Sequence, residues 1–435
     1  MSAAQHFTLA ARLQAMLDVE GALADAEASL DVIPRSAALA IRDACRAELY
    51  DGAAIETDAR RAGNPAIPLV RQLTHRVAAA DTEAARYVHW GATSQDIIDT
   101  GLVLQLRSSI PAVLDDLARA ADAAADHTRR YAGTPMAGRT WLQQATPVTF
   151  GLKAAGWVDA LDRVACGIHN TLNAAMVLQF GGASGTLAAL GDRGIPVAER
   201  IAAALRLKVP SLPWHAHRDR LAALSCALAV ATGTLGKIAR DIALLAQTEV
   251  GEAHEGTPDG GGSSSMPHKQ NPVNSAIALA AAVRAPGLVA IVLAGMPQEH
   301  ERGLGGWQAE WQTIPELVIV TADAAAAIAE ALERLVVDPA RMRANLESSG
   351  GLILSEAVAM RLAVRLGKQA AHALVERSAR RAVGEHRAFA DVLAQDPEVS
   401  AILNRREIDD ILSPETYLGS TSAFIADVLA RHAKA

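Results

Sequence analysis

The sequence predicts an all-α protein, and three observations carry that prediction. Of its 435 residues, 50% are hydrophobic but only 3% are aromatic, so small and aliphatic side chains must fill the core. Alanine is very common, and it favours helix because it loses no side-chain entropy there. The middle of the chain carries an apolar heptad pattern, and no β-α-β rhythm occurs. We therefore expect long helices that pack closely on small residues.

The expected elements fall into three groups along the chain. Shorter amphipathic helices are predicted over residues 9–30 and 36–50, with a break at Ile33 and Pro34. Long helices follow, and the predicted ranges are 94–130, with a kink at Pro111, 149–177, 272–297 and 308–347. Short helices with frequent charges return from about residue 350. These groups predict an N-terminal helical domain (1–96), a central long-helix bundle (97–348) and a C-terminal helical domain (349–435).

The heptad pattern forms one seam of eight residues whose spacing alternates between three and four. Its members are Leu221, Leu224, Leu228, Ala231, Leu235, Ile238, Ile242 and Leu245. A seam of this length needs an equally long partner helix, and a bundle of such helices exceeds what one chain can cover. We therefore expect seams to remain exposed and to pair between the subunits of a homo-oligomer.

Charge, cysteine content and hydropathy exclude several classes of protein. A net charge of −7 provides no broad basic field for nucleic acid. Three dispersed cysteines form neither a disulfide framework nor a zinc site, and the first ten residues have no secretory pattern, so we expect a cytoplasmic protein. Residues 276–296 are apolar but rich in alanine and contain Arg284 and Pro286, which favours a buried helix over a membrane span. No metal-ligand spacing occurs, and we expect no metal and no organic cofactor.

Two glycine-rich loops, 181–193 and 251–271, interrupt the long helices. The second reads GEAHEGTPDGGGSSSMPHKQN. A flexible Gly/Ser linker is the simplest interpretation, but a linker has no need of the Met-Pro-His-Lys-Gln-Asn that follows. The residues before and after Lys269 exclude a Walker A loop. Hydroxyls, a cation and an amide on one loop predict a mobile segment that closes over an anionic substrate.

Three segments carry a resemblance to a known family. Residues 262–271 fit the pattern GSSxMPxKxN, residues 89–96 (HWGATSQD) resemble HxGxTSxD, and residues 138–147 (GRTWLQQATP) resemble GxTHxQxAxP. On these segments the chain is identified as a member of the fumarase/aspartase superfamily. The resemblance implies a central bundle of long helices in a homotetramer with active sites shared between subunits.

The resemblance also implies roles for individual positions. Ser263 matches the mobile catalytic serine, and Lys269 and Asn271 match the substrate-binding lysine and asparagine. The positions that match groups holding substrate carboxylates are Thr93, Ser94, Thr140 and Gln143, and His89 and Arg302 match a substrate-binding histidine and arginine. Alternatives stay open, because Thr93 or Ser94 could only cap a helix and His89 could be structural. Trp307 and Trp311 are expected to pack on one helical face, and Arg218 either belongs to the site or pairs with acidic neighbours.

Two departures from the family pattern point to a changed reaction. The residue after Thr140 is normally a histidine that acts as an acid, and here it is Trp141. A glutamate that pairs with this histidine is replaced by Ala276. Losing both avoids an unpaired buried charge. A carboxylate leaving group needs no protonation, because its pKa is near 4. The reverse of an elimination that expels a carboxylate is the addition of a carboxylate to an activated alkene. Within one molecule, this addition closes a lactone.

This argument points to the bacterial 3-carboxy-cis,cis-muconate cycloisomerases, a branch that the chain resembles at residues 138–151, 213–220 and 300–311. The resemblance implies a small tricarboxylate substrate, 4-carboxymuconolactone as product, and a place in protocatechuate degradation by the β-ketoadipate pathway. Trp141 would then shape the pocket. The alternative enzyme is an adenylosuccinate- or argininosuccinate-type lyase that releases fumarate, with His89 or His268 as its acid. A non-catalytic relative with the same helical fold is the alternative from another class.

Overall fold

The computed structural model describes residues 3–256, 262, 266 and 269–434, and these are mostly helical. The all-α prediction is confirmed, and two short two-stranded ribbons are the exceptions within those ranges. The chain divides into two compact units. Unit 1 contains Met1–Leu117, Val164–Gly236 and Ile277–Ala326, and unit 2 contains Ala118–Arg163, Lys237–Ala276 and Ala327–Ala435.

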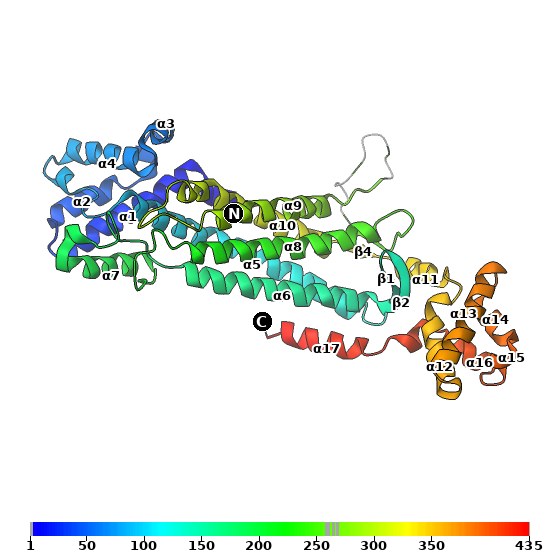
Figure 1. The fold of residues 1–435 in the computed structure, drawn as a ribbon. Coiled ribbons are helices and arrows are strands. Elements are labelled where there is room, and N and C mark those ends of the chain that lie inside the picture. The colour runs from blue at the N-terminus through cyan, green and yellow to red at the C-terminus, as the bar shows by residue number, and fades with distance from the viewer. Residues whose placement is uncertain (1–2, 257–261, 263–265, 267–268, 435) are drawn as a thin grey trace. The chain divides into compact units, whose positions relative to one another are not determined.

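Unit 1 includes five shorter helices, in which α1 packs against α2 and α7 (Figure 1). They are α1 (Leu9–Ser29), α2 (Arg35–Ala44), α3 (Gly52–Ala62), α4 (Ala66–Ala80) and α7 (Gly194–Leu205). The helix expected over 9–30 is confirmed, but the one expected over 36–50 ends early. The side-chain amide of Gln14 donates to the carbonyl of Cys45 (3.2 Å) and accepts from the backbone N–H of Ala47 (2.8 Å). It therefore satisfies backbone groups that a longer α2 would have paired.

The long helices lie close to their predicted ranges. They are α5 (Ser94–Arg130), α6 (Phe150–Ala175), α8 (Asp219–Leu245), α9 (Val273–Ala294) and α10 (Gly306–Glu333). The single helix expected over 308–347 was wrong, because α10 ends at Glu333 and is followed by strand β4 (Leu335–Val337) and α11 (Pro339–Glu347). Pro339 has no N–H to continue a helix, and the Asp338 side chain accepts from the N–H of Arg341, which caps α11.

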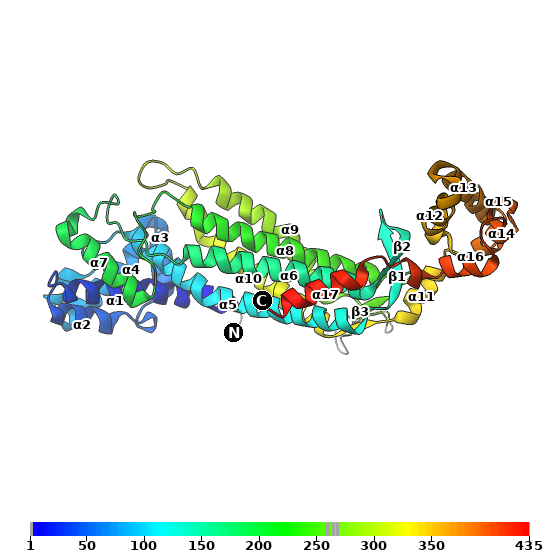
Figure 2. The same ribbon diagram turned by 90° about the horizontal axis from the view of Figure 1, so that it is seen from below.

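Unit 2 contains the two ribbons and the C-terminal helices. Strand β1 (Pro135–Thr140) pairs antiparallel with β2 (Gln143–Thr149), and β3 (Ala253–Glu255) pairs antiparallel with β4. Figure 2 shows the β1–β2 hairpin projecting from the helices of unit 2. The sequence did not predict it, because residues 138–147 show no alternation of apolar and polar side chains.

The C-terminal helices enclose a core of their own. They are α12 (Ser355–Leu366), α13 (Lys368–Gly384), α14 (Phe389–Gln395), α15 (Pro397–Ser400), α16 (Arg405–Ile411) and α17 (Thr421–His432). The core side chains come from α12, α13, α14, α15 and α16, and not from α17, and they include Val358, Leu374, Phe389, Val392 and Ile408. Each is almost fully buried, so this segment has the packed interior that a domain requires.

The heptad seam does not stay exposed for a partner subunit, and that expectation was wrong. All eight seam residues of α8 are buried within one chain. Close packing on small residues is confirmed within unit 1, where α8 approaches α9 at Gly236. A Cβ atom at this glycine would lie only 2.5 Å from the Cβ of Ala282. A seam of small and aliphatic residues therefore finds its partners inside the same chain.

Helix α9 leaves much of its apolar surface uncovered. Three helices, α5, α8 and α9, are long and apolar enough to cross a membrane by length and composition. Their most apolar segments are 72%, 56% and 22% buried, respectively, so the prediction of a buried helix over 276–296 does not hold for a single chain. The exposed side chains include Ile277, Val283 and Ile291. A helix with this much apolar surface in water requires a cover.

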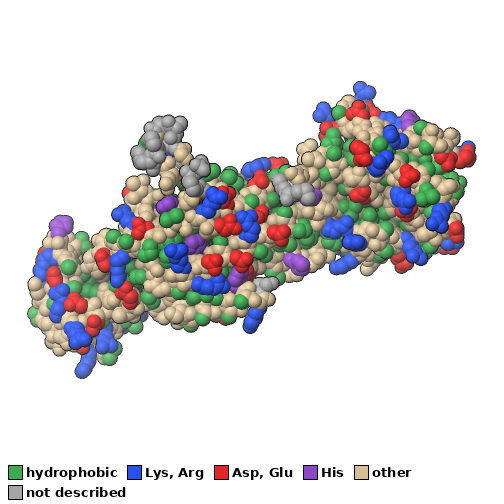
Figure 3. Space-filling view, turned by 180° about the vertical axis from the view of Figure 1, so that it is seen from behind, with side chains coloured by type: hydrophobic (Ala, Val, Ile, Leu, Met, Phe, Trp, Pro, Cys, Tyr) green, Lys and Arg blue, Asp and Glu red, His purple; other side chains and the backbone are tan. Residues whose placement is uncertain are grey.

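Charged side chains of both signs are interspersed on the face shown in Figure 3. Blue Lys and Arg side chains alternate with red Asp and Glu side chains across this view. This face therefore has no broad basic field of the kind that binds nucleic acid by counterion release.

A buried ion cluster joins three elements in the core of unit 1. The guanidinium of Arg218 donates two hydrogen bonds to Asp99 on α5 (2.7 and 3.0 Å) and others to Glu310 on α10, the shortest of 2.5 Å. The indole N–H of Trp307 also donates to Asp99 (2.9 Å), and Trp311 packs edge-on against Trp307, as their spacing predicted. All three charged side chains are at most 1% exposed. Arg218 is therefore paired with acidic neighbours inside the fold.

Removing Arg218 should strongly destabilise unit 1. Arg218→Met leaves Asp99 and Glu310 buried without a counter-charge, and we expect the free energy of unfolding to fall by about 3–5 kcal/mol. The matched control is Arg377→Met, which breaks an exposed pair with Glu398 and should change stability little. Urea denaturation followed by circular dichroism measures both. Equal effects of the two substitutions would contradict this role for Arg218.

Candidate active site

Asp96 is the anchor around which the predicted residues of unit 1 are arranged. Its carboxylate is completely buried and accepts hydrogen bonds from three backbone N–H groups, those of Thr93 (3.0 Å), Gly181 (3.0 Å) and Gly182 (2.9 Å). Nε2 of His215 lies 2.7 Å from the same carboxylate. One side chain therefore fixes the start of α5 against the glycine-rich loop that begins at residue 181.

Thr93 and Arg302, both predicted site residues, are in direct contact. Arg302 lies just before α10, and its Nη1 donates to the Thr93 hydroxyl (3.0 Å) while its Nη2 donates to the carbonyl of Ala183 (2.8 Å). Its Nε is buried and has no hydrogen-bond partner among the described residues. Thr93 directly precedes α5, yet its hydroxyl accepts from Arg302, so helix capping alone does not describe it.

Ser94 and His89 complete the group in unit 1. Ser94 is the first residue of α5, where the helix N-terminus favours a negatively charged group. Gly91, between them, has φ +68°, and a Cβ atom there would lie 2.7 Å from Cγ of Leu190. Only glycine fits this approach of the 89–93 segment to the loop of residues 181–193. The segment is therefore held against the same loop that Asp96 anchors.

His89 is paired with Glu20, a residue that the sequence analysis did not single out. Nδ1 of His89 lies 2.6 Å from Oε1 of Glu20, whose side chain is fully buried on α1. Burial of the imidazole opposes its protonation, but the Glu20 carboxylate, helped by Asp96, outweighs burial and raises the pKa of His89. One sequence signal could have identified Glu20. It is an ionisable residue on a helical face that is otherwise occupied by Met16, Leu17, Leu23 and Ala24.

Thr140, Trp141 and Gln143 lie on the hairpin of unit 2. Thr140 and Gln143 face each other in the β1–β2 register, and the turn between them is Trp141–Leu142. Both turn residues have positive φ angles, +53° and +64°, as a two-residue type I′ turn requires. The Trp141 side chain is 98% exposed in the single chain. Arg139, one residue before Thr140, fixes the hairpin through two hydrogen bonds (2.8 and 2.7 Å) to the buried carboxylate of Glu252.

The signature loop, which is the glycine-rich loop of residues 251–271, is described only in part. Ser263 and His268 lie outside the described residues, whereas Lys269 is exposed and Asn271 is partly buried. The buried carboxylate of Glu255 accepts from the backbone N–H groups of Asn274 (3.0 Å) and Ser275 (2.8 Å). It therefore anchors the start of α9, two residues beyond Asn271. Ala276, the position where the family has a glutamate, is exposed.

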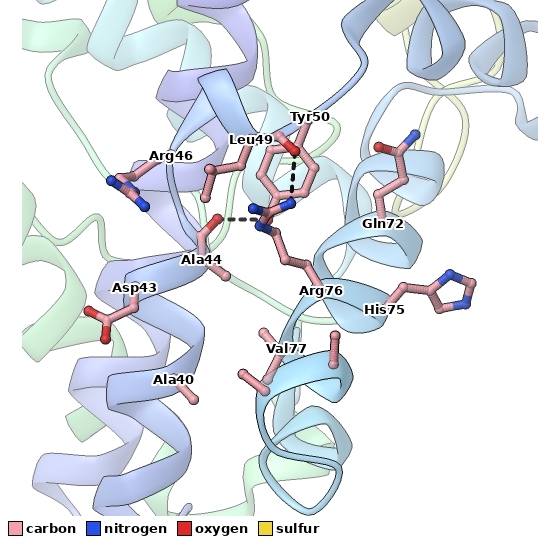
Figure 4. Close-up of a pocket in the computed structure, with 12 residues that line it drawn as sticks. Ala40, Asp43, Ala44, Arg46, Leu49, Tyr50, Gln72, His75, Arg76 and Val77 are labelled. Carbon is pink, nitrogen blue, oxygen red and sulfur yellow. Dashed lines mark hydrogen bonds between the residues drawn. The ribbon is translucent and has the colours of Figure 1, made fainter.

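The predicted residues thus form three groups within the described residues. His89, Thr93, Ser94 and Arg302 belong to unit 1, the hairpin residues belong to unit 2, and Lys269 and Asn271 lie at the end of the signature loop in unit 2. A cavity of about 660 Å³ in unit 1, between α2 and α4, includes none of them (Figure 4). Two of its polar side chains hold the backbone, because Tyr50 donates to the carbonyl of Ala44 and Arg76 to that of Leu49.

Comparisons with known proteins show which family the chain belongs to. The sequence model of the family described as Lyase matches residues 2–287, and that of the adenylosuccinate lyase C-terminus matches residues 351–428. The chain is 53% identical to the 3-carboxy-cis,cis-muconate cycloisomerase of Pseudomonas aeruginosa, over 97% of this chain and 92% of that protein. It is 51% identical to the enzyme of the same name from Bradyrhizobium diazoefficiens, over 96% and 93%.

A solved structure matches the fold as well. The crystal structure of 3-carboxy-cis,cis-muconate lactonizing enzyme from Pseudomonas putida superposes with a TM-score of 0.94 at 47% identity, and the match covers 99% of this chain and 96% of that one. The family model, the relatives that match over nearly the full length and the solved structure all lead to the same assignment. The chain belongs to the lyase family of the fumarase/aspartase superfamily.

Proposed function

We propose that this protein is a cycloisomerase that converts 3-carboxy-cis,cis-muconate to 4-carboxymuconolactone. The observation that carries the proposal is the identity of about half of all residues, over nearly the whole chain, to proteins named for that reaction. The residues give a physical reason for the same choice. Trp141 and Ala276 replace an acid and its glutamate partner, which a reaction without a basic leaving group does not need.

The proposed reaction is an isomerisation in which no atoms are lost. A carboxylate oxygen of the substrate forms a bond to an alkene carbon, and the π electrons move toward the neighbouring carboxylate to give an aci-carboxylate. That intermediate then takes a proton on the carbon next to the carboxylate. Ser263 is proposed to transfer this proton, and Lys269 is proposed to stabilise the electron-rich intermediate. Each role rests on the position of the residue in the signature loop.

Substrate binding is assigned to the remaining residues. Arg302 and His89 would supply cationic donors for the carboxylates, while Ser94 would supply a hydroxyl at the N-terminus of α5. Thr93 is held by Arg302, so these two would act together. Asn271, Thr140 and Gln143 would supply neutral donors, and Trp141 would shape the pocket. A tricarboxylate suits this set because it has three anionic groups to bind.

We further propose a homotetramer in which different subunits supply the site regions. Two exposed features support it, the apolar surface of α9 and the side chain of Trp141, because both need a cover in water.

The three-domain division is retained as a proposal, supported at the C-terminus by the core of residues 358–408. A cytoplasmic location is proposed as well, and it is consistent with three free cysteines, Cys45, Cys166 and Cys226.

An ultraviolet assay tests the function directly. The protein should remove the conjugated-diene absorbance of 3-carboxy-cis,cis-muconate and should release no fumarate from adenylosuccinate or argininosuccinate. Both lyase substrates belong in the assay, because the C-terminal segment matches an adenylosuccinate lyase model. Fumarate release without loss of the diene would establish the lyase alternative. If the protein catalysed neither reaction, it would be a non-catalytic relative.

Ser263→Ala should lower kcat by about 10²-fold or more, because proton transfer by a positioned side chain contributes about 10²–10⁴-fold. Ser265→Ala, at a variable position of the same signature, is the matched control and should retain most activity. Initial rates with 3-carboxy-cis,cis-muconate measure both variants. A near-normal kcat for Ser263→Ala would remove that residue from the proton-transfer step.

Val283→Asp should dissociate the oligomer and abolish turnover together. Val283 is 80% exposed on α9, and an aspartate in an apolar interface would be buried without a partner. Val364→Asp on α12, where the valine is 83% exposed, is the matched control and should leave both assembly and activity unchanged. Light scattering after size-exclusion chromatography reports the mass. A Val283→Asp variant that stays tetrameric, or that is active as a monomer, would contradict the proposed assembly.

A further inference from the structure

We propose that Glu20 is a positioning residue whose buried carboxylate holds His89 as a cation and aims its Nε2–H at a substrate carboxylate. This inference rests on the proposed function for the identity of the ligand. Glu20 itself matches none of the three motifs, and it lies 69 residues away from His89 in the sequence. The pair is argued from geometry and charge within unit 1.

The surroundings of Glu20 make His89 its only described counter-charge. The side chain is fully buried, one carboxylate oxygen lies 2.6 Å from Nδ1 of His89, and the other has no hydrogen-bond partner among the described residues. An ionised carboxylate buried without a counter-charge is costly, whereas a carboxylate beside an imidazolium forms a neutral pair. The buried oxygen therefore favours the protonated form of the imidazole, with Nδ1–H donating to Glu20.

The backbone of His89 is held in an unusual conformation that fixes the ring. Its φ angle is +60°, a region that non-glycine residues rarely adopt and that persists only where the surroundings enforce it. The Glu20 hydrogen bond and the glycine contact at residue 91 supply that constraint. The side chain is 19% exposed, and among the described residues Nε2 forms no hydrogen bond. With Nδ1 engaged, Nε2–H is the donor left for a ligand.

The cation has neighbours that suit an anionic ligand. Four residues along the chain, Thr93 is hydrogen-bonded to Arg302, and α5 begins at Ser94 with its N-terminal dipole. Asp96, the nearest other carboxylate, is occupied by three backbone N–H groups and by His215. An imidazolium, a guanidinium and a helix N-terminus in one unit would together suit a molecule with more than one carboxylate.

Two other titratable groups influenced by Glu20, Glu27 and Cys45, have pKa values that are shifted toward their uncharged forms. Glu27 lies seven residues after Glu20 on α1. Burial, and after it the charge of Glu20, raises the pKa of Glu27 to about 9. Burial and then Glu20, Asp18 and Asp25 raise the pKa of the Cys45 thiol. Because the pKa of His89 is raised in the folded protein, its cation persists to higher pH than that of an unpaired histidine and is lost as the pH rises through the raised pKa.

The first experiment measures the protonation state of His89 without substrate. The protein labelled with ¹⁵N-histidine is titrated by NMR, and His89→Gln identifies the resonances. We expect an imidazolium at pH 7.5 in the parent protein and a neutral imidazole in Glu20→Gln, with the midpoint lowered by about one pH unit or more. Glu27→Gln is the matched control, because it replaces an uncharged buried carboxyl on the same helix and should leave the midpoint unchanged. An unchanged midpoint in Glu20→Gln would overturn the proposal.

The second experiment measures the kinetic consequence. In Glu20→Gln the alkaline limb of the pH profile of kcat/KM should move to lower pH by a similar amount, with KM raised about tenfold or more at pH 8 and kcat changed less. Glu20→Asp, which keeps the charge, should restore part of the loss, and it serves as the test variant if Glu20→Gln does not fold. A profile that moves equally in Glu27→Gln would overturn the proposal. If the NMR result holds but 3-carboxy-cis,cis-muconate is not converted, the pair stands and the proposed function fails.

Discussion

The arrangement of the site in unit 1 depends on one buried carboxylate, that of Asp96. Three backbone N–H groups and an imidazole converge on it from segments that are far apart in the sequence. Because a buried carboxylate without partners would be costly, the start of α5 and the loop at residues 181–182 must both remain in place. Arg302 can then reach Thr93 and the carbonyl of Ala183 at the same time. The polar interior of this unit therefore serves mainly to hold backbone and cations in position.

A second constraint concerns which charges the site contains and which it lacks. In the proposed site, Trp141 and Ala276 stand where the family pattern has an acid and its glutamate partner, and Arg302 and His89, which is paired with Glu20, would supply the cationic groups. Cations and helix dipoles stabilise negative charge that develops on carboxylates. A site without a general acid is poorly suited to protonate a poor leaving group. Together these changes favour a reaction that moves charge between carboxylates over one that expels an amine.

The sequence predicted the helices well and the tertiary pairing less well. Helix α5 was predicted at its observed bounds, because periodicity and caps are local properties of the chain. The helix over 308–347 was wrong, since Leu335–Val337 pairs with a strand some 80 residues earlier, a contact that no local pattern encodes. Motif positions identified Thr93 and Arg302, which the structure brings together. Glu20 was missed because its significance depends on a partner 69 residues away, and the buried seam was misplaced because an apolar stripe does not say which helix covers it.

The most direct test of the central claim follows the hydrogen that completes the reaction. 3-Carboxy-cis,cis-muconate is incubated with the protein in D₂O, and the products are identified by ¹H NMR and mass spectrometry. The account predicts a single isomeric lactone with one deuterium on the carbon next to a carboxylate, because addition of the internal carboxylate is completed by one proton that exchanges with solvent. A lactone without solvent deuterium, or a product released as separate fragments, would contradict it.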